Sequence, residues 1–109
     1  MTAPFDVRSA EMNGALVIEV SGEVDGATER QFVEQVVDAV STTEAGRVVL
    51  DLSRVGFMDS SGLRVVLSCK RRADERGIPL TLAIASDSPV SRLFDVSGVA
   101  ATFQYEPMA

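Results

Sequence analysis

The chain has 109 residues, of which 46% are apolar and 24% are charged, and its formal net charge is −6. This length fits one domain with its own hydrophobic core, and the single cysteine, Cys69, excludes a disulfide within the chain. Histidine is absent, which excludes Ser–His–Asp and Cys–His catalysis, and the acidic charge disfavours nucleic acid as a partner. We therefore expect one domain over residues 1–109, with an ordered core at about 5–105 and with no metal or cofactor.

The first half of the chain predicts a β-hairpin followed by a helix. Asn13-Gly14 is a strong signal for a type I′ hairpin turn, and apolar residues alternate along the strand after it. Residues 22–26, "GEVDG", predict an acidic loop. A helix should follow, because Thr28 and Gln31 form a capping-box pattern. Its apolar residues recur at helical spacing; they are Phe32, Val33, Val36, Val37 and Val40.

The second half predicts strands that alternate with helices. "RVVLDL" (47–52) is typical of a strand buried on both faces, and a loop over 53–59 should lead into a helix over about 60–76. "LTLAIA" predicts the next strand. Ser88 should cap a third, short helix, and "ATFQYE" can add a last strand. This order of elements predicts an α/β domain in which an N-terminal β-hairpin joins a mostly parallel sheet with about three helices.

The stretch "FMDSSG" (57–62) begins the second helix and has two interpretations. Asp59 or Ser60 can simply be the N-cap, since both residue types accept hydrogen bonds from free N–H groups of a first turn. A helix N-terminus also favours a phosphate, so a serine there could accept one without unfolding the helix. Phe57 is expected to pack inward, whereas Met58 could pack inward or form the rim of a docking surface. Gly62 either keeps the first turn open to a partner or is small for close packing.

The segment "VLDLSRVGFMDSSGLRVVLSCKRRADERG" resembles the central motif of bacterial anti-sigma-factor antagonists, which belong to the STAS-domain family. "VIEVSGEVDGATERQF" is similar to the second strand, acidic loop and first helix of that family, and "SPVSRLFDVSGV" is similar to its third helix. The resemblance covers almost the whole chain. Its specific element is D-S-[ST]-G after an apolar strand, and it implies a single STAS-like domain.

The resemblance implies a regulatory protein that is not an enzyme. In the family, the unphosphorylated antagonist binds an anti-sigma factor that is also a serine kinase, and the sigma factor is released. The kinase phosphorylates the first serine of the motif, which is Ser60 here, and binding is abolished until a serine phosphatase removes the phosphate. Asp59 and Asp25 match the family's acidic residues, while Arg64 is less typical and is expected to tune partner choice. The residues expected to bind the partner are Glu23, Asp25, Met58, Asp59, Ser61, Gly62 and Arg64.

Some of these residues also have structural interpretations. Asp25 could cap the first helix or stabilise a turn, and Ser61 is expected to be structural, with alternative phosphorylation as the other possibility. Cys69 should be a small buried hydrophobic residue. The basic run 70–72 is either a solvated helix face or a partner contact.

Two other functions compete with the antagonist. The chain could be a STAS adaptor subunit that regulates a membrane transporter; the intact D-S-S-G and the free-standing length favour the antagonist. An enzyme with Ser60 as its nucleophile is disfavoured, because the chain has no histidine and its one lysine, Lys70, is not beside Ser60 in sequence. No apolar segment reaches the ~20 residues that cross a bilayer. We therefore expect a cytoplasmic protein without membrane insertion.

Overall fold

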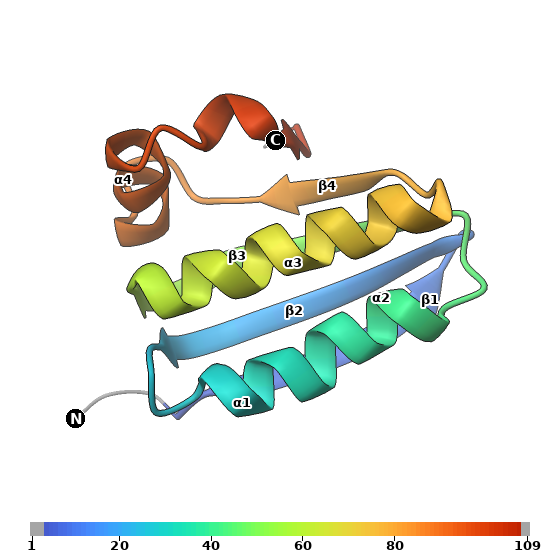
Figure 1. The fold of residues 1–109 in the computed structure, drawn as a ribbon, viewed down its shortest axis with the longest axis horizontal. Helices are drawn as coiled ribbons and strands as arrows, with labels where there is room; N and C mark the ends of the chain where they lie inside the picture. Colours follow the sequence, from blue (N-terminus) through green and yellow to red (C-terminus); the bar gives the residue numbers. More distant parts are fainter. Residues whose placement is uncertain (1–3, 108–109) are drawn as a thin grey trace.

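The computed structural model describes residues 4–107, which form one sheet and its covering helices (Figure 1). The element order is the one that the sequence predicts, and the predicted α/β fold is confirmed. The strands are β1 (Asp6–Met12), β2 (Ala15–Val24), β3 (Arg47–Met58), β4 (Leu80–Ala83) and β5 (Gln104–Tyr105). The helices are α1 (Glu29–Phe32), the π-helical η1 (Val33–Val37), α2 (Asp38–Thr42), α3 (Ser60–Arg76), α4 (Pro89–Val96) and the 3₁₀-helix η2 (Ala100–Thr102).

The sheet has the order β1-β2-β3-β4-β5. Strands β1 and β2 are antiparallel, and every later pair is parallel. The hairpin turn has positive φ at both Asn13 (53°) and Gly14 (80°), as a type I′ turn requires. Because β2, β3 and β4 are parallel to one another, their carboxyl ends lie at the same edge of the sheet. The loops that carry function in such sheets usually lie at this edge.

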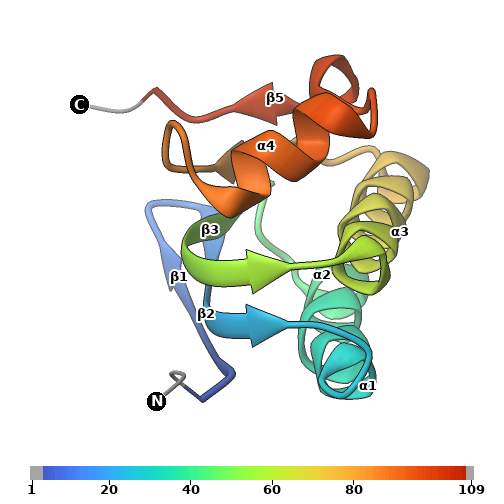
Figure 2. The ribbon, with the colours of Figure 1, turned by 90° about the vertical axis from the view of Figure 1, so that its left-hand side faces the viewer.

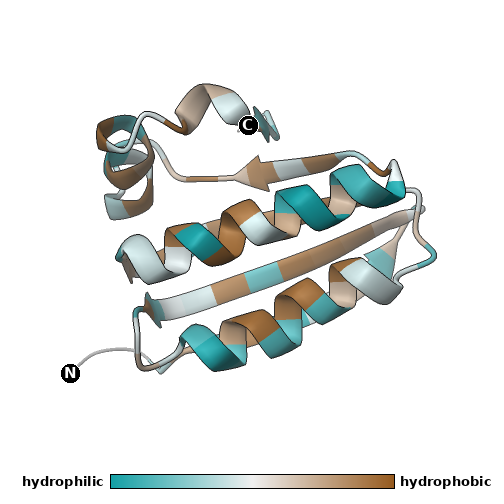
Figure 3. Cartoon of the chain, in the orientation of Figure 1, coloured by the Kyte–Doolittle hydropathy of each residue, from teal (hydrophilic) through white to brown (hydrophobic). Residues whose placement is uncertain are grey.

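Helix α3 and the continuous helix α1–η1–α2 lie side by side on one face of the sheet (Figure 2). Apolar and polar residues alternate along both helices (Figure 3), and apolar residues such as Val36 and Val66 are fully buried. The core between them includes the fully buried side chains of Ile18, Leu50 and Val66. These helices thus hold the β2 and β3 carboxyl ends in a fixed position relative to the N-terminus of α3.

The continuous helix α1–η1–α2 buries some of its apolar residues and exposes others. Phe32, Val36 and Val40 are fully buried, whereas the side chain of Val33 is 38% exposed. The stripe is a single row at intervals of four residues, and the π-helical segment between residues 33 and 37 lies within it. Val33 therefore lies at the margin of the apolar stripe and is partly exposed to solvent.

Strands β2 and β3 continue further than predicted. Residues 22–24, expected in a loop, pair with β3. Residues 53–58, also expected in a loop, belong to β3, and Arg54, Val55, Phe57 and Met58 pair with β2. Two register shifts, between Glu19 and Ser21 and between Gly22 and Glu23, let twelve residues of β3 pair along ten residues of β2. Such bulges interrupt the apolar alternation from which strands are recognised, which explains the error.

The ends of α3 and α4 follow the predicted capping chemistry. Asp59 is the N-cap of α3, and its Oδ1 accepts a hydrogen bond from the Ser61 N–H at 2.9 Å. Gly77 follows α3 with a φ of 70°, which is the usual left-handed end of a helix. The Oγ of Ser88 accepts a hydrogen bond from the Ser91 N–H at 3.1 Å. The last strand is shorter than expected and covers Gln104–Tyr105.

Candidate functional site

Ser60 is the first residue of α3 and its side chain is exposed. Asp59 already supplies the cap, so the fold does not require the Ser60 hydroxyl for that purpose. Within residues 4–107, no hydrogen bond of the Ser60 side chain is found. Ser61 differs, because it is half-buried and its Oγ accepts a hydrogen bond from Arg64 at 3.4 Å. The two hydroxyls of the motif are therefore not equivalent, and Ser60 is the free one.

The turn between β2 and α1 is organised by Asp25 and Thr28. The Asp25 Oδ1 accepts hydrogen bonds from the N–H groups of Ala27 (3.0 Å) and Thr28 (3.2 Å). The Thr28 Oγ1 accepts from the Asp25 N–H at 3.0 Å. The predicted capping box between Thr28 and Gln31 is wrong, because the Thr28 side chain bonds back into the turn and makes no cap bond to the helix. Asp25 thus shapes the turn and remains half-buried at its surface.

This turn and the start of α1 lie against the first turn of α3. The Asp59 N–H donates to the Val24 carbonyl at 3.2 Å. A Cβ on Gly26 would lie 3.9 Å from the Ser61 Oγ. An ion pair joins Arg64 to Glu29 of α1, with 3.7 Å between the Arg64 guanidinium nitrogen and the Glu29 Oε1. The seven residues that this arrangement gathers are called the Ser60 surface below: Asp25, Gly26, Glu29, Asp59, Ser60, Ser61 and Arg64.

Two residues expected to contact a partner lie inside the protein instead. Met58 is 4% exposed, so the prediction that its side chain contacts a partner is wrong for this structure. Gly62 is also buried, and a Cβ at this position would lie 2.7 Å from both Met58 Cγ and Val24 Cγ1. Of the two structural explanations for Gly62, close packing is the one observed. The glycine lets the first turn of α3 rest directly on the ends of β2 and β3.

Phe57 and Glu23 lie together on the other face of the sheet. They are paired in the β2–β3 register, immediately before Val24 and Met58, which point toward α3. Because side chains alternate along a strand, Phe57 and Glu23 point away from α3. Phe57 is 45% exposed, so the prediction that it packs inward is wrong. Glu23 is not brought to the Ser60 surface.

The Ser60 surface continues into a shallow groove along α1. The groove has a volume of about 350 Å³ and is lined by Gly26, Glu29, Arg30, Val33 and Glu34. The exposed part of Val33 gives it an apolar centre between charged side chains. Sequence reasoning missed Glu29 and the groove, because the first depends on a contact between two helices and the second on which side of α1 faces the sheet.

The remaining chemically distinctive residues of α3 are structural. Cys69 is fully buried, and desolvation raises the pKa of its thiol to about 12. It is therefore a neutral hydrophobic residue, as predicted, and not a reactive thiolate. In the basic run, Lys70 pairs with Asp74 at 2.8 Å and Arg72 pairs with Glu75 at 3.6 Å. The run lies on a solvated helix face.

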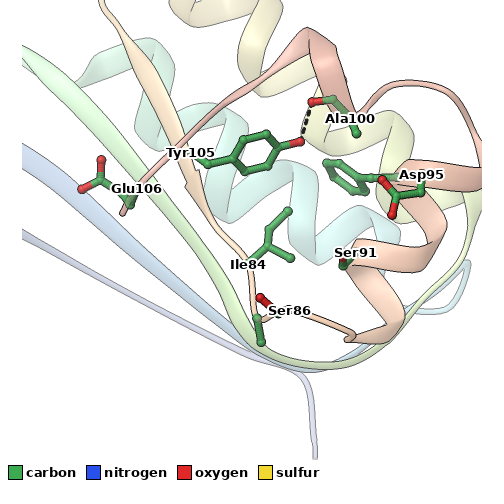
Figure 4. Close-up of a pocket in the computed structure, with 9 residues that line it drawn as sticks. Ile84, Ser86, Ser91, Asp95, Ala100, Tyr105 and Glu106 are labelled. Atoms are coloured by element: carbon green, nitrogen blue, oxygen red, sulfur yellow. Dashed lines mark hydrogen bonds between the residues drawn. The ribbon is translucent and has the colours of Figure 1, made fainter. Parts of the chain in front are cut away.

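A second cavity, of about 260 Å³, lies between α4, β5 and the loop that follows β4 (Figure 4). The Tyr105 hydroxyl donates a hydrogen bond to the Ala100 carbonyl at 2.6 Å across one side of it. Burial, and then the negative charge of Asp95, raise the pKa of Tyr105. No lining residue belongs to the Ser60 surface, and no charged or polar side chain of the cavity is deeply buried without a partner.

The comparisons with known proteins agree with this geometry. The family model described as "Mlab, STAS domain" matches residues 7–104, which is nearly the whole chain. The chain belongs to the STAS-domain family. The recognised resemblance to this family is thereby confirmed. None of the helices described between residues 4 and 107 is long and apolar enough to cross a membrane.

Several proteins similar to this chain are named as anti-sigma factor antagonists. This STAS domain is 34% identical over 86 residues to the anti-sigma F factor antagonist of Paenibacillus polymyxa, covering 79% of this chain and 73% of the relative. It matches the crystal structure of an anti-sigma factor antagonist from Mycobacterium paratuberculosis with a TM-score of 0.84 and 25% identity, covering 99% and 92% of the two chains. The unphosphorylated anti-sigma factor antagonist SpoIIAA matches with a TM-score of 0.70 at 22% identity, covering 97% and 90%. The phosphorylated form of SpoIIAA from Bacillus matches with 0.68 at 22%, covering 95% and 92%.

Proposed function

We propose that this STAS domain is an anti-sigma factor antagonist whose binding to its anti-sigma factor is switched by phosphorylation of Ser60. The observation that carries the proposal is that Asp59, and not Ser60, is the N-cap of α3. Asp59 caps the helix, while the neighbouring Ser60 is exposed and its hydroxyl makes no hydrogen bond to residues 4–107. The name of the Paenibacillus polymyxa relative supports the choice of partner class.

The anti-sigma factor is proposed to be the kinase as well. In the transfer, the Ser60 Oγ attacks the γ-phosphorus of ATP, the bond from that phosphorus to the ADP oxygen breaks, and the hydroxyl proton passes to a base on the kinase. A serine phosphatase would hydrolyse the phosphoserine and restore the binding form. The STAS domain supplies only the acceptor, so it acts as a substrate and binding protein and not as an enzyme. ATP-dependent switching of this kind places the protein in the cytoplasm.

The charges around Ser60 support a local switch. Phosphorylation adds about −1.5 to −2 charges at neutral pH, and it does so on a surface that also carries Asp25, Asp59 and Glu29. A unit charge placed about 5 Å from a carboxylate of the partner costs roughly 3 kcal/mol at an effective dielectric of about 20. Because about 1.4 kcal/mol is a tenfold change in affinity, such repulsion suffices for a hundredfold loss of binding.

The fold should not change on phosphorylation. A helix N-terminus stabilises negative charge, so a phosphate on the first residue of α3 is compatible with the helix. For SpoIIAA, both the unphosphorylated and the phosphorylated structures share this fold, with TM-scores of 0.70 and 0.68 against this chain. The proposed switch therefore changes the surface and leaves the backbone in place.

The test uses the whole chain and a candidate anti-sigma kinase. Incubation with ATP should add the mass of one phosphoryl group, Ser60→Ala should abolish the gain, and Ser61→Ala should keep it. In titration calorimetry, wild type and Ser60→Ala should bind the kinase, whereas the phosphorylated protein should bind at least a hundredfold more weakly. Ser60→Asp should weaken binding in the same direction. Ser86→Asp, which adds one charge at an exposed position of the β4–α4 loop, is the matched control and should bind normally.

Equal binding by wild type, Ser60→Asp and the phosphorylated protein would contradict the switch. That result would favour the adaptor of a membrane transporter, in which a phosphate on Ser60 has no such effect on the partner.

A further inference from the structure

Among residues 4–107, Arg64 is the basic residue whose side chain contacts the first turn of α3. Its guanidinium donates a hydrogen bond to the Ser61 Oγ at 3.4 Å and lies 3.7 Å from the Glu29 Oε1. The side chain thus extends back toward the start of the helix, in the direction that helical side chains favour. Its guanidinium lies at the same turn as Ser60.

Ser60 and Arg64 are four residues apart on one helix, so their side chains share a face with about 5–6 Å between Cβ atoms. Arg64 is mostly exposed, with 65% of its side chain accessible to solvent. The distance of 3.7 Å to Glu29 is also longer than a good charge-assisted hydrogen bond, which measures about 2.7–2.9 Å. The present pairing is therefore loose.

We propose that Arg64 binds the phosphate of phosphorylated Ser60 and gives up Glu29 in doing so. This inference rests on Ser60 being the phosphorylated residue. A phosphate carries more charge than a carboxylate and offers three acceptor oxygens, and a guanidinium can bind two of them at once. Since both groups are on α3, the new pair forms without closing a loop of chain.

The exchange has a consequence for α1. In the unphosphorylated protein, the Arg64–Glu29 ion pair links α1 to α3 and neutralises Glu29. After phosphorylation, Glu29 lines the groove of α1 without Arg64 as its cation. The modification therefore removes positive charge from the α1 side of the Ser60 surface as well as adding negative charge on the α3 side. A partner docked across both helices experiences both changes.

The test measures the second pKa of the phosphate by ³¹P NMR. Phosphoserine is incorporated at position 60 through a reassigned codon, so no kinase or partner is needed. Asp25, Glu29 and Asp59 are the acidic groups near the phosphate and raise its pKa, while Arg64 lowers it. We expect the pKa to be about 0.5 units higher in Arg64→Gln than in wild type, as suits an exposed pair. The difference should shrink in 1 M salt.

Arg71→Gln is the matched control, because it removes the same charge from an exposed position of the same helix. Arg71 lies about two turns beyond Arg64 and about three turns from Ser60. The substitution should leave the phosphate pKa within about 0.1 units of wild type, given screening over about 10 Å. Arg64→Lys should recover part of the effect, since lysine keeps the charge but not the planar fork. Equal pKa values in wild type and Arg64→Gln, or an equal shift in Arg71→Gln, would overturn the proposal.

A double-mutant cycle tests the exchange itself. Glu29→Gln removes the competitor for Arg64, so it should lower the phosphate pKa more when Arg64 is present than in the Arg64→Gln background. Equal effects in both backgrounds would overturn the exchange. The two failures can be told apart. Loss of the Arg64 effect overturns the phosphate contact and leaves Ser60 as the phosphorylated residue, whereas failure of the kinase to modify Ser60 contradicts the proposed function on which this inference rests.

Discussion

Helices α3 and α4 begin in similar ways at the same edge of the sheet, yet their first turns are used differently. Both follow a parallel strand, and both have an oxygen-bearing N-cap. In α4 the serine is the cap itself, Pro89 follows it, and Val90 is fully buried. In α3 an aspartate is the cap, so the serine at the first helical position remains exposed. The comparison teaches that a serine at a helix start is available for chemistry when another residue has already taken the capping role.

The largest predicted effect tests how closely α3 rests on the sheet. Gly62→Val should destabilise the protein by about 3 kcal/mol, because its Cβ would lie 2.7 Å from Met58 and Val24 and the valine adds two methyl groups. Urea unfolding measures the change. Gly56→Val is the control, since a Cβ at Gly56 meets nothing within 4 Å, and its effect should be below about 0.5 kcal/mol. Equal losses in the two variants would show that Gly62 is not a packing requirement.

The buried faces of the two helices also differ, because α3 buries the thiol of Cys69 and α4 buries apolar side chains. Burial raises the pKa of Cys69 from 9.0 to about 12. Below pH 9 the thiol is protonated in both the folded and the unfolded protein. Between pH 9 and 12 only the unfolded protein loses the proton, so the free energy of unfolding should fall by about 1.4 kcal/mol per pH unit, or about 2 kcal/mol at pH 10.5.

Denaturant unfolding at several pH values checks this. Cys69→Ala should flatten the alkaline slope, although it is less stable at neutral pH. Tyr105, whose pKa is also raised, is present in both proteins and cancels in the comparison. An unchanged slope in Cys69→Ala would contradict the assignment.

Removing either N-cap should have a similar, smaller effect. Asp59→Ala and Ser88→Ala should each cost about 1 kcal/mol, because each leaves a first-turn N–H group without its acceptor. Asp59→Asn should retain most of the stability, since asparagine caps about as well. Thermal unfolding of the four proteins, wild type included, gives the values. A negligible effect of Asp59→Ala would mean that Ser60 takes over as the cap, and the contrast between α3 and α4 would be lost.

The smallest predicted effect concerns the first helical residues themselves. Ser60→Ala should change the stability by less than about 0.5 kcal/mol, because the exposed hydroxyl makes no hydrogen bond to the rest of the described chain. Pro89→Ala should cost about 0.4–1 kcal/mol, because the unfolded chain gains conformational freedom. Differential scanning calorimetry can rank the two. A larger loss for Ser60→Ala than for Pro89→Ala would imply that Ser60 has a structural role.

The sequence was informative wherever local chemistry decides the structure. The hairpin at Asn13-Gly14, the cap at Asp59 and the left-handed end at Gly77 are properties of a few adjacent residues, and each could be predicted. The element order and the family also follow from the sequence. The sequence also suggested that the Ser60 hydroxyl could accept a phosphate, because the D-S-S-G motif contains more residues that can cap a helix than one helix needs.

Other features depend on contacts between distant residues and could not be predicted. The bulges of β3 determine that Met58 is buried and Phe57 is exposed, and no local pattern reports a bulge. The Arg64–Glu29 pair requires the relative position of two helices. Gly62 had two interpretations in sequence because its neighbours Met58 and Val24 are identified only in three dimensions.

The two bulges have a consequence for how relatives of this protein should be aligned. Twelve residues of β3 run beside ten residues of β2, so the surplus of two residues sets where Asp59 and α3 begin. A deletion of one residue between 53 and 57 would leave every letter of the D-S-S-G motif intact. It would nevertheless turn the end of the strand over and carry Ser60 away from the β2–α1 turn. Homologues that keep the motif but differ in the length of this segment should therefore not be assumed to keep the site.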